Sequence, residues 1–439
     1  MKRITTLAVL LLLFFVVSNA QTDSIIKISL DDAVLKGLEQ NYQILISKKD
    51  LEVSVNNNSW GKAGMYPTVS IGASQSNRFN NSENQMSGDR SNMLTNSISP
   101  SLTAQMVLFN GFAIRLNKKN LDMYEKISNV NLKMTLENTV TDIIHDYYSI
   151  ILEKEKLKVV KTLMNLSKDR YEYIKLKKDL GVAVTYDVLQ FKNNFLTDSS
   201  NFLMQLMNTK VAIREFSKTI GDNNLNEYLP TTNFVVNDTT YALGDIENMM
   251  LKNNTTLNMQ YLNVDLINNS IKLAKSSMYP SLSLGAGADY SNTRLQYFDP
   301  SINSTSYSYG AYASLNLSYT IFNGNNRRRN ISNAKIQAEK IRLKTEELEM
   351  IMRNNLFTIW QLYENRKQLL KVADENFKAS KLNLDIASEK FNSGAINSFN
   401  YRDIQMMYLN TSYAFLQAKY NLIITENDLN KLTGNILNN

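Results

Sequence analysis

Few residues of this chain have the types and spacing that catalysis or metal binding requires. The 439-residue sequence contains no cysteine, which excludes disulfides, thiolate metal sites and a cysteine nucleophile. Its single histidine, His145, lies beside Tyr147 and Tyr148 in a helical pattern, and without a second ligand it is expected to serve in packing or on the surface. There is no glycine-rich phosphate loop, and no motif singles out a nucleophile or a catalytic pair of acids. We therefore expect no catalytic residues, no cofactor, no metal site and no enzymatic activity.

Charge is mildly basic and is spread along the chain. The formal net charge is +7, and it becomes 7 − 2 = +5 without Lys2 and Arg3, which lie in a segment that we expect to be removed. The basic run Arg327–Arg329 begins a predicted helix. Only one of its three positions is also basic in the first half, where Arg115 corresponds to Arg328. A nucleic-acid site is one interpretation of this run. A solvated or headgroup-facing run at a membrane edge fits its position better, so we expect no nucleic-acid partner.

The chain is a tandem duplication. The stretch that begins at Pro67 is similar in sequence to one that begins at Pro280, which lies 280 − 67 = 213 residues further along the chain. Such a repeat must be settled before any element is assigned. We expect a first repeat over 21–221, a linker over 222–242 and a second repeat over 243–439. The same ungapped step relates Leu30 to Leu243, Asn41 to Asn254, Asn110 to Asn323, Gly181 to Gly394 and Gly221 to Gly434.

The first twenty residues have the pattern of a secretory signal peptide. A basic region, Met1–Arg3, precedes the apolar run Leu7–Val17, and Ser18–Ala20 supplies small residues before a cleavage point. The alternative is a membrane anchor, but the apolar run is shorter than the roughly 20 residues that span a bilayer. We therefore expect residues 1–20 to be removed and the protein to be exported.

Two segments of each repeat alternate between apolar and polar residues, which predicts β-strands. Val69 and Ile71 alternate with Thr68 and Ser70, and the polar stretch 77–96 has the composition of a loop. Each segment has the length and the two-residue period of a transmembrane strand. The alternative is a pair of half-buried soluble hairpins, but the signal peptide and the long polar loops favour the membrane. The predicted strands are about 65–78, 97–109, 278–291 and 307–322.

The remainder of each repeat has helical periodicity. After Gly111 the pattern continues without proline for a span that corresponds to a helix about 100 Å long. Gly181 then interrupts it, and a left-handed residue at such a position can end a helix. From Tyr401 to Leu432 the apolar residues recur at alternating steps of three and four, which predicts a coiled-coil seam. The predicted helices are about 31–62, 111–178, 185–220, 244–277, 324–391 and 398–433.

Each repeat is therefore expected to be a long antiparallel helical hairpin with a glycine at its tip and a β-hairpin at the opposite end. The fold class is mostly α, with four strands per chain in a membrane β-barrel. Four strands cannot close a barrel, and an open edge in lipid leaves backbone groups unpaired at a cost of several kcal/mol each. Two chains would supply eight strands around a filled interior, and three chains would supply twelve, with room for a lumen.

With these features the sequence resembles the outer-membrane efflux protein family, the TolC-like channel-tunnels. The resemblance covers the whole chain after residue 20, and it rests on an ordered set of motifs of which none is strong alone. The set comprises strand openings at Pro67 and Pro280, strand-to-helix turns at Asn110-Gly111 and Asn323-Gly324, and helical tips over Leu180–Val188 and Ser393–Tyr401.

The resemblance implies a homotrimer with a 12-stranded barrel in the bacterial outer membrane and an α-helical tunnel in the periplasm. It implies a passive, gated exit duct of a tripartite efflux or secretion system. The implied partners are outer-membrane lipid, a periplasmic adaptor (membrane fusion) protein and an inner-membrane pump of the RND or ABC type. The alternative is a non-pore periplasmic or surface coiled-coil scaffold, which would not need apolar strand faces. The sequence specifies neither the substrate nor the pump class.

The resemblance also implies a periplasmic gate near the tips, where aspartates ring the pore. The family motif places Asp187 there in the first repeat, whereas the matching residue of the second is Asn400, with Asp403 one helical turn further on. A ring of carboxylates would favour cations over anions. The alternative role of each acid is to stabilise a helix N-terminus. The family's basic gate partner is absent, because Ile396 occupies its position.

The two tips are the expected contact surface for the adaptor. They are the points most distant from the predicted strands, and small residues form their turns. The residues expected at this surface are Gly181, Val182, Thr185, Gly394, Ala395 and Ser398.

Overall fold

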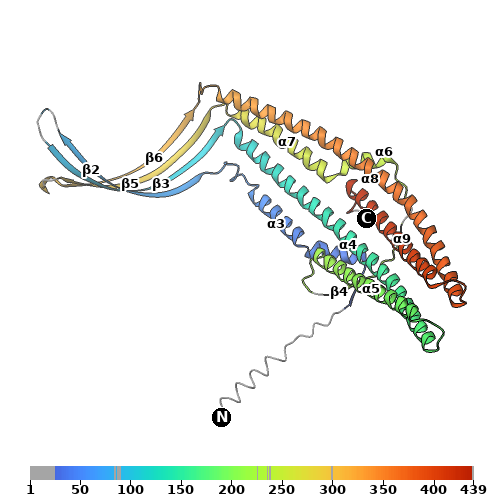
Figure 1. Ribbon diagram of the computed structural model, residues 1–439. Helices are drawn as coiled ribbons and strands as arrows, with labels where there is room; N and C mark the ends of the chain where they lie inside the picture. The colour runs from blue at the N-terminus through green and yellow to red at the C-terminus, as the bar shows by residue number, and fades with distance from the viewer. Residues whose placement is uncertain are drawn as a thin grey trace, which may run out of the picture. The chain divides into compact units, whose positions relative to one another are not determined.

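The computed structural model describes residues 25–437 except 84–85, 87–89, 225, 235, 237–238 and 298–299, and the chain is mostly helical (Figure 1). The predicted signal peptide lies outside the described residues. Two compact units divide the chain, and each takes segments from both sequence repeats. The first unit consists of Met1–Ile46, Lys133–Asn254 and Ile351–Asn439. The second consists of Ser47–Leu132 and Thr255–Met350.

The helices of the two halves repeat with the step of the sequence. Helices α4 and α8 have 67 residues each, and α5 and α9 have 35 each. Every helix of the first half starts 213 residues before its counterpart, as between Ala113 and Asn326. The pairs are α2 (Leu30–Gln40) with α6 (Leu243–Asn253), α3 (Tyr42–Asn57) with α7 (Thr255–Ser276), α4 (Ala113–Asp179) with α8 (Asn326–Asn392), and α5 (Thr185–Thr219) with α9 (Ser398–Leu432).

The single helices predicted over 31–62 and 244–277 are wrong, because each is two helices separated by an asparagine. Asn41 has an extended backbone, with ψ of 125°, and Asn254 has ψ of 123°. Each side-chain amide donates a hydrogen bond to the carbonyl of the last residue of a long helix. The distances are 2.8 Å from Asn41 Nδ2 to Thr219 O and 2.9 Å from Asn254 Nδ2 to Leu432 O.

The segment predicted as a linker, 222–242, contains a strand that the sequence did not reveal. Strand β4 (Glu227–Pro230) pairs in parallel with β1 (Ile25–Ile28). Lys36 Nζ lies 2.6 Å from Tyr228 Oη and 3.3 Å from Asp222 Oδ2. Burial opposes ionisation of Asp222, but hydrogen bonds, first that from Tyr228, outweigh it and lower the pKa of Asp222 to about 2.

The main core of the first unit gathers around Tyr147. This side chain is fully buried, and its hydroxyl donates to Ile28 O at 3.0 Å. The backbone N–H groups of Thr231 and Thr232 donate to the same hydroxyl at 3.2 and 3.1 Å. A buried tyrosine hydroxyl therefore has its polar requirements met while its ring packs among apolar neighbours. The buried members of this core include Ile143, Ile150, Ile213, Phe216, Ile220 and Tyr228.

Four long strands form one antiparallel sheet in the second unit, in the order β2-β3-β5-β6 (Figure 1). Their bounds are Thr68–Glu83, Arg90–Asn110, Ser281–Tyr297 and Ser304–Ser318. The predicted loop over 77–96 is therefore mostly strand. Cross-strand pairing continues from Thr68 opposite Gln105 to Glu83 opposite Arg90, so backbone hydrogen bonds extend the hairpin beyond the apolar residues.

One face of the sheet is apolar and the other is polar. A row of paired positions on the apolar face reads Ile71, Leu102, Ala288 and Ala311 across the four strands. The adjacent row on the opposite face reads Ser70, Thr103, Gly287 and Tyr312. The apolar side chains are exposed, Ile71 to 83%. A β carbon on Gly287 would lie 2.8 Å from the ring of Tyr312, so glycine makes room for that ring.

The sheet also has two free edges within the chain. Strand β2 pairs with β3 alone and β6 pairs with β5 alone in the described residues, so the outer edges of β2 and β6 have no partner there. Such edges readily pair with another chain.

Candidate functional site

The two helical tips have the same backbone geometry. Gly181 and Gly394 have φ angles of +76° and +77°, which L side chains rarely adopt. The N–H of the residue after each glycine donates to a carbonyl of the helix end, as from Val182 to Lys177 O at 2.8 Å and from Ala395 to Lys390 O at 2.8 Å. This pattern satisfies carbonyls that a helix C-terminus leaves free. A β carbon would meet nothing within 4 Å at either glycine, so backbone conformation rather than crowding requires glycine there.

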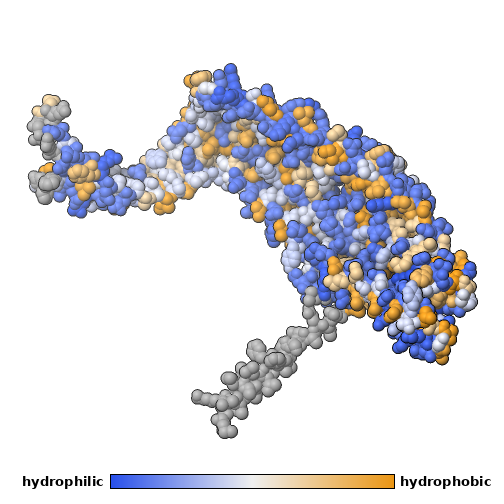
Figure 2. All heavy atoms as spheres, in the orientation of Figure 1, coloured by the Kyte–Doolittle hydropathy of each residue, from blue (hydrophilic) through white to orange (hydrophobic). Residues whose placement is uncertain are grey.

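The first tip is more apolar than the second. Leu180 and Val182 are exposed to 69% and 72%, and Val184 and Tyr186 are also exposed. Figure 2 shows hydrophobic patches at the end of the helices where these tips lie. The residues at the matching positions of the second tip are Ser393, Ala395, Asn397 and Phe399.

The acids predicted for the gate lie on the helices that follow the tips. Asp187 is in the first turn of α5 and is partly exposed, whereas Asp403 is exposed on α9. In the described part of one chain, neither carboxylate forms an ion pair. Asn400 is exposed, and its N–H donates to Asn397 Oδ1 at 2.9 Å, which caps α9. A single chain therefore does not bring the predicted gate residues together.

An ion pair that sequence reasoning missed joins the two repeats near the tips. Arg402 of α9 donates to both carboxylate oxygens of Asp198 of α5, at 2.7 Å each. The Asp198 side chain is 4% exposed, and Ser167 of α4 also donates to it. The matching positions of the second repeat hold Ser380 and Thr411, whose hydroxyls lie 2.5 Å apart. The signal available in the sequence was a pair of departures between the repeats: Asp198 where the second repeat has Thr411, and Arg402 where the first has Leu189.

A second arginine strengthens the same junction. The Arg170 guanidinium of α4 lies 5.2 Å from the ring of Phe391 and 5.5 Å from that of Tyr401. These two rings stack with centroids 4.9 Å apart, and Arg170 also donates to Ser388 Oγ at 3.3 Å. Cation–π contacts of this kind are worth about 0.5–2 kcal/mol, more when desolvated. The two hairpins of one chain are thus tied together about one to four helical turns from the helix ends at their tips.

We expect Arg402→Leu to lower the melting temperature of the purified protein. It leaves the carboxylate of Asp198 buried without its partner, and breaking such a pair costs about 3–5 kcal/mol. The matched control is the double variant Arg402→Leu with Asp198→Thr, which installs the residues found at the equivalent positions Leu189 and Thr411. Thermal unfolding followed by helical circular dichroism measures both. A double variant no more stable than the single one would contradict the prediction.

The strand-to-helix turns are strained in the same way in both repeats. Gly111 and Gly324 have φ of +65°, and each is followed by a non-glycine residue with positive φ, Phe112 at 67° and Asn325 at 64°. Asn110 Oδ1 accepts a hydrogen bond from the N–H of Ile114 at 3.2 Å, which helps start α4. The predicted strand openings, Pro67 and Pro280, each lie just before a strand, in front of β2 and β5 respectively. These positions shape the backbone and present no reactive group.

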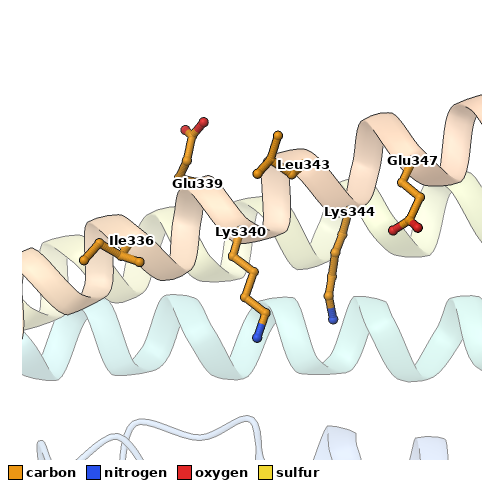
Figure 3. Close-up of a pocket in the computed structure, with 6 residues that line it drawn as sticks. All are labelled: Ile336, Glu339, Lys340, Leu343, Lys344 and Glu347. Carbon is orange, nitrogen blue, oxygen red and sulfur yellow. The ribbon is translucent and has the colours of Figure 1, made fainter.

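A groove on the surface of α8 is lined by residues of that helix alone (Figure 3). Ile336 and Leu343 are exposed in it and lie seven residues apart, between charged side chains. The same spacing continues to Met350 and Phe357, which are also exposed. A seven-residue apolar spacing on an exposed helix face is typical of packing against another helix. The charged side chains that line the groove are Glu339, Lys340, Lys344 and Glu347.

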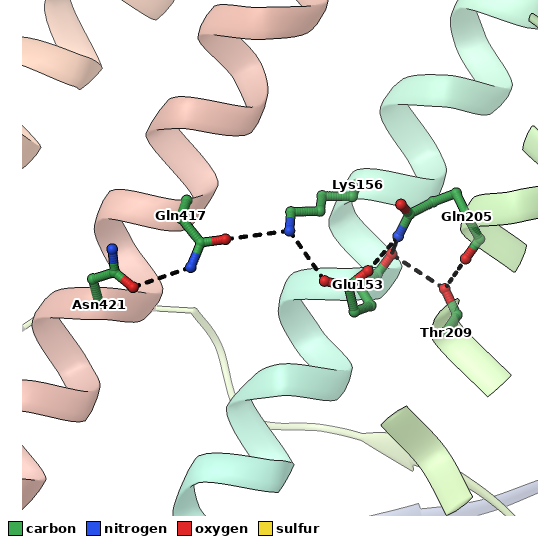
Figure 4. A network of polar contacts seen from close by, with 6 residues as sticks. All are labelled: Glu153, Lys156, Gln205, Thr209, Gln417 and Asn421. Atoms are coloured by element: carbon green, nitrogen blue, oxygen red, sulfur yellow. Dashed lines mark hydrogen bonds and ion pairs between the residues drawn. The ribbon is translucent and has the colours of Figure 1, made fainter. Parts of the chain in front are cut away.

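A polar network crosses between the repeats farther from the tips (Figure 4). Lys156 of α4 donates to Gln417 Oε1 of α9 at 3.3 Å and to Glu153 Oε1 at 3.1 Å. Glu153 in turn accepts from Gln205 of α5 at 2.6 Å, and its carbonyl accepts from Thr209 at 3.3 Å. The network fixes the register of α4 against both α5 and α9.

The chemistry available elsewhere is limited. His145 Nε2 lies 3.6 Å from Asp428 Oδ1, and burial lowers the pKa of His145 while it raises that of Asp428. Among the residues that the structure describes, no three His, Asp or Glu side chains are placed to hold a metal ion. In the same residues, no helix is both long and apolar enough to cross a membrane.

The fold is that of solved outer-membrane channels. The Campylobacter jejuni CmeC outer membrane channel matches with a TM-score of 0.74 and 16% identity over 92% of this chain and 85% of that one. The open-state MtrE outer membrane channel of Neisseria gonorrhoeae matches with 0.70 and 14% over 93% and 89%. VceC of Vibrio cholerae, an outer membrane protein, matches with 0.68 and 11% over 92% and 96%. None of the curated protein sequences matches this chain.

A family match agrees with this class of fold. Residues 247–435 match the family model described as Outer membrane efflux protein. The predicted resemblance is therefore confirmed: residues 247–435 match this family's model, and the chain has the fold of solved outer-membrane channels. The predicted localisation in the bacterial outer membrane agrees with this family.

Proposed function

We propose that this protein is the outer-membrane duct of a tripartite efflux or secretion system. The observation that carries the proposal is the sheet, which has one exposed apolar face, one polar face and, among the described strands, two edges without a partner. Lipid would cover the apolar face, and the polar face would line a lumen. A non-pore scaffold would have no use for exposed side chains such as those of Ile71 and Tyr309, which are 83% and 87% exposed.

Closure of the sheet requires further copies of the chain. Edge strands β2 and β6 are 16 and 15 residues long, and unpaired backbone groups in lipid cost several kcal/mol each. Three copies in a ring would give 3 × 4 = 12 strands, in which β6 of one copy pairs with β2 of the next. Helices α4, α5, α8 and α9 of the three copies would continue the barrel as a periplasmic tunnel.

The tips would receive the periplasmic adaptor and close the tunnel at rest. The exposed apolar side chains of the first tip, Leu180, Val182 and Val184, are suited to a protein partner. Three copies of Asp187 and Asp403 would surround one axis, with Asn400 between them in the second repeat. The duct itself is passive: an inner-membrane pump, of the RND or ABC type, supplies the energy, and the duct performs no chemical step.

We expect the purified protein to be a detergent-stable homotrimer recovered from the outer-membrane fraction. The measurement is light scattering with correction for bound detergent, together with ion conductance after insertion into planar bilayers. A monodisperse monomer, or a trimer from the soluble periplasmic fraction that gives no conductance, would overturn the proposal and favour the scaffold.

A further inference from the structure

A groove lies at the end of the sheet where β3 passes into α4, within the second unit (Figure 1). Its volume is about 540 Å³, which is in the range of ligand sites. Its walls are mostly apolar, and one guanidinium lies among them. The residues that line this junction groove include Trp60, Met65, Met106, Phe109, Phe112 and Arg115.

The junction groove continues the apolar face of the sheet. The pairing of β3 with β5 shifts by one residue after Val107, which places Phe109 opposite Leu282 on that face. The ring of Phe112 packs edge to face against the ring of Phe109, with centroids 5.2 Å apart. The Arg115 guanidinium lies 5.9 Å from the centre of the Phe112 ring. A continuous series of contacts therefore leads from the apolar face to a positive charge.

The positive charge beside the junction groove is available to an anion. Arg115 and Lys119 lie four residues apart on one face of α4, and both are exposed. Among the described residues, neither of them forms an ion pair. The first acid of α4, Asp122, is already paired with Lys118 at 2.5 Å. Because α4 begins at Ala113, the positive end of its dipole adds to the same field. The groove is therefore complementary to an anion attached to an apolar body.

The second repeat shows that the turn itself does not require the aromatic part of the groove. Phe112 has φ of +67°, a left-handed conformation that is strained for a bulky residue. Its counterpart, Asn325, has φ of 64°, and asparagine adopts this conformation more readily. The first repeat thus keeps a strained ring beside the groove. Two further residues at this site also differ between the repeats, since the second repeat has Leu273 in place of Trp60 and Ser332 in place of Lys119.

We propose that the junction groove binds one anionic phospholipid of the periplasm-facing leaflet. The phosphate contacts Arg115 and Lys119, and an acyl chain covers the rings of Phe112 and Trp60. The occupant is an anionic lipid because two cations attract a net negative headgroup and repel the ammonium of a zwitterionic one. A free phosphate ion would leave the apolar walls uncovered. This inference rests on the proposed function, which places the apolar face in lipid, and it adds one defined lipid site per copy.

Quenching of Trp60 fluorescence tests the site. The chain has two tryptophans, and Trp360→Phe leaves Trp60, which is 41% exposed, as the single reporter. The full-length reporter protein is reconstituted in phosphatidylcholine with rising mole fractions of phosphatidylglycerol or phosphatidylcholine that carries bromine, a quencher, on its acyl chains. We expect phosphatidylglycerol to reach half-maximal quenching at a mole fraction at least about fivefold lower, because one basic residue near an anionic lipid contributes about that factor. Native mass spectrometry of the unsubstituted protein should independently count one retained phosphatidylglycerol per copy.

Three variants of the reporter protein separate the headgroup contact from the acyl-chain contact. Arg115→Gln should reduce the preference for phosphatidylglycerol by about fivefold. The matched control is Arg328→Gln, which removes the same charge from the equivalent position of the second repeat and should leave the preference unchanged. Phe112→Asn installs the residue that the second repeat has in the same backbone conformation, and it should weaken quenching by both lipids.

Two kinds of result would contradict the inference. Equal quenching by both lipids in the reporter protein, or an unchanged preference in Arg115→Gln, would show that only unselective lipid surrounds this end of the sheet. Either result overturns the lipid site and leaves the proposed function standing. Absence of quenching by either lipid would overturn both, because this end of the sheet would then lie outside the membrane.

Discussion

Replacing Gly394 by tryptophan is expected to abolish export while the trimer still assembles. Gly394 is exposed and has φ of +77°, and a β carbon at this position would meet no atom within 4 Å, so the indole would project into open space at the tip. If the adaptor contacts this surface, a large rigid side chain prevents the close approach that the small turn residues allow. The left-handed backbone adds a cost of about 1–2 kcal/mol for any L residue, which is small beside the loss of a whole interface.

The matched control is Gly394→Ala, which has the same backbone strain without the bulk. Cells carrying each variant are compared for survival in a compound to which deletion of the gene makes them sensitive. Gly394→Trp should reach the sensitivity of the deletion, and Gly394→Ala should remain close to the parent. Trimer yield is measured in the same cells. Full resistance with tryptophan would mean that this tip is not a contact surface.

Replacing Asp187 and Asp403 together by asparagine is expected to remove most of the cation preference of the channel. The acids follow the tip glycines by six and nine residues, so three copies would place six carboxylates near one axis. Like charges within a Debye length, about 8 Å at physiological salt, repel each other and attract cations. In one chain neither acid has an ion-pair partner among the described residues, and Ile396 stands where the resemblance to the family implies an arginine. The free carboxylates would therefore act on permeating ions.

Planar bilayers under a tenfold salt gradient measure this preference, since an ideally cation-selective channel reverses at about 59 mV. We expect the double variant to lose at least about half of the parent's reversal potential and to resist block by multivalent cations. The control is Asp50→Asn with Asp265→Asn, which removes the same charge from exposed positions on α3 and α7. An unchanged reversal potential in the gate variant would show that these acids serve only their helix N-termini.

The tips and the gate differ in how far one chain defines them. The left-handed glycines are local features, so the turn at Gly181 and the turn at Gly394 were apparent from residue type and spacing. The proposed gate is an assembly feature, because Asp187 and Asp403 would acquire a shared environment only when several copies meet. A single chain presents these acids on two separate helices, α5 and α9, and does not bring them together.

The sequence by itself determined the local and periodic features of this protein. The step of 213, the alternation along the strands and the steps of three and four along the helices depend only on residue type and order. Each predicts an element without knowledge of any distant segment. The exposed apolar face around Ile71 followed for the same reason, since alternate strand residues always point to opposite faces.

The tertiary structure decided the features that depend on distant partners. Asn41 ends a helix because its amide reaches Thr219 O, 178 residues away, and its helical periodicity alone gives no sign of the break. Strand β4 exists because it pairs with β1 across about 200 residues of chain. Asp198 is stable in its buried position because Arg402 and Ser167 converge on it from two other helices. Periodicity indicates which face of an element is buried. Only the packed fold determines which particular groups contact that face.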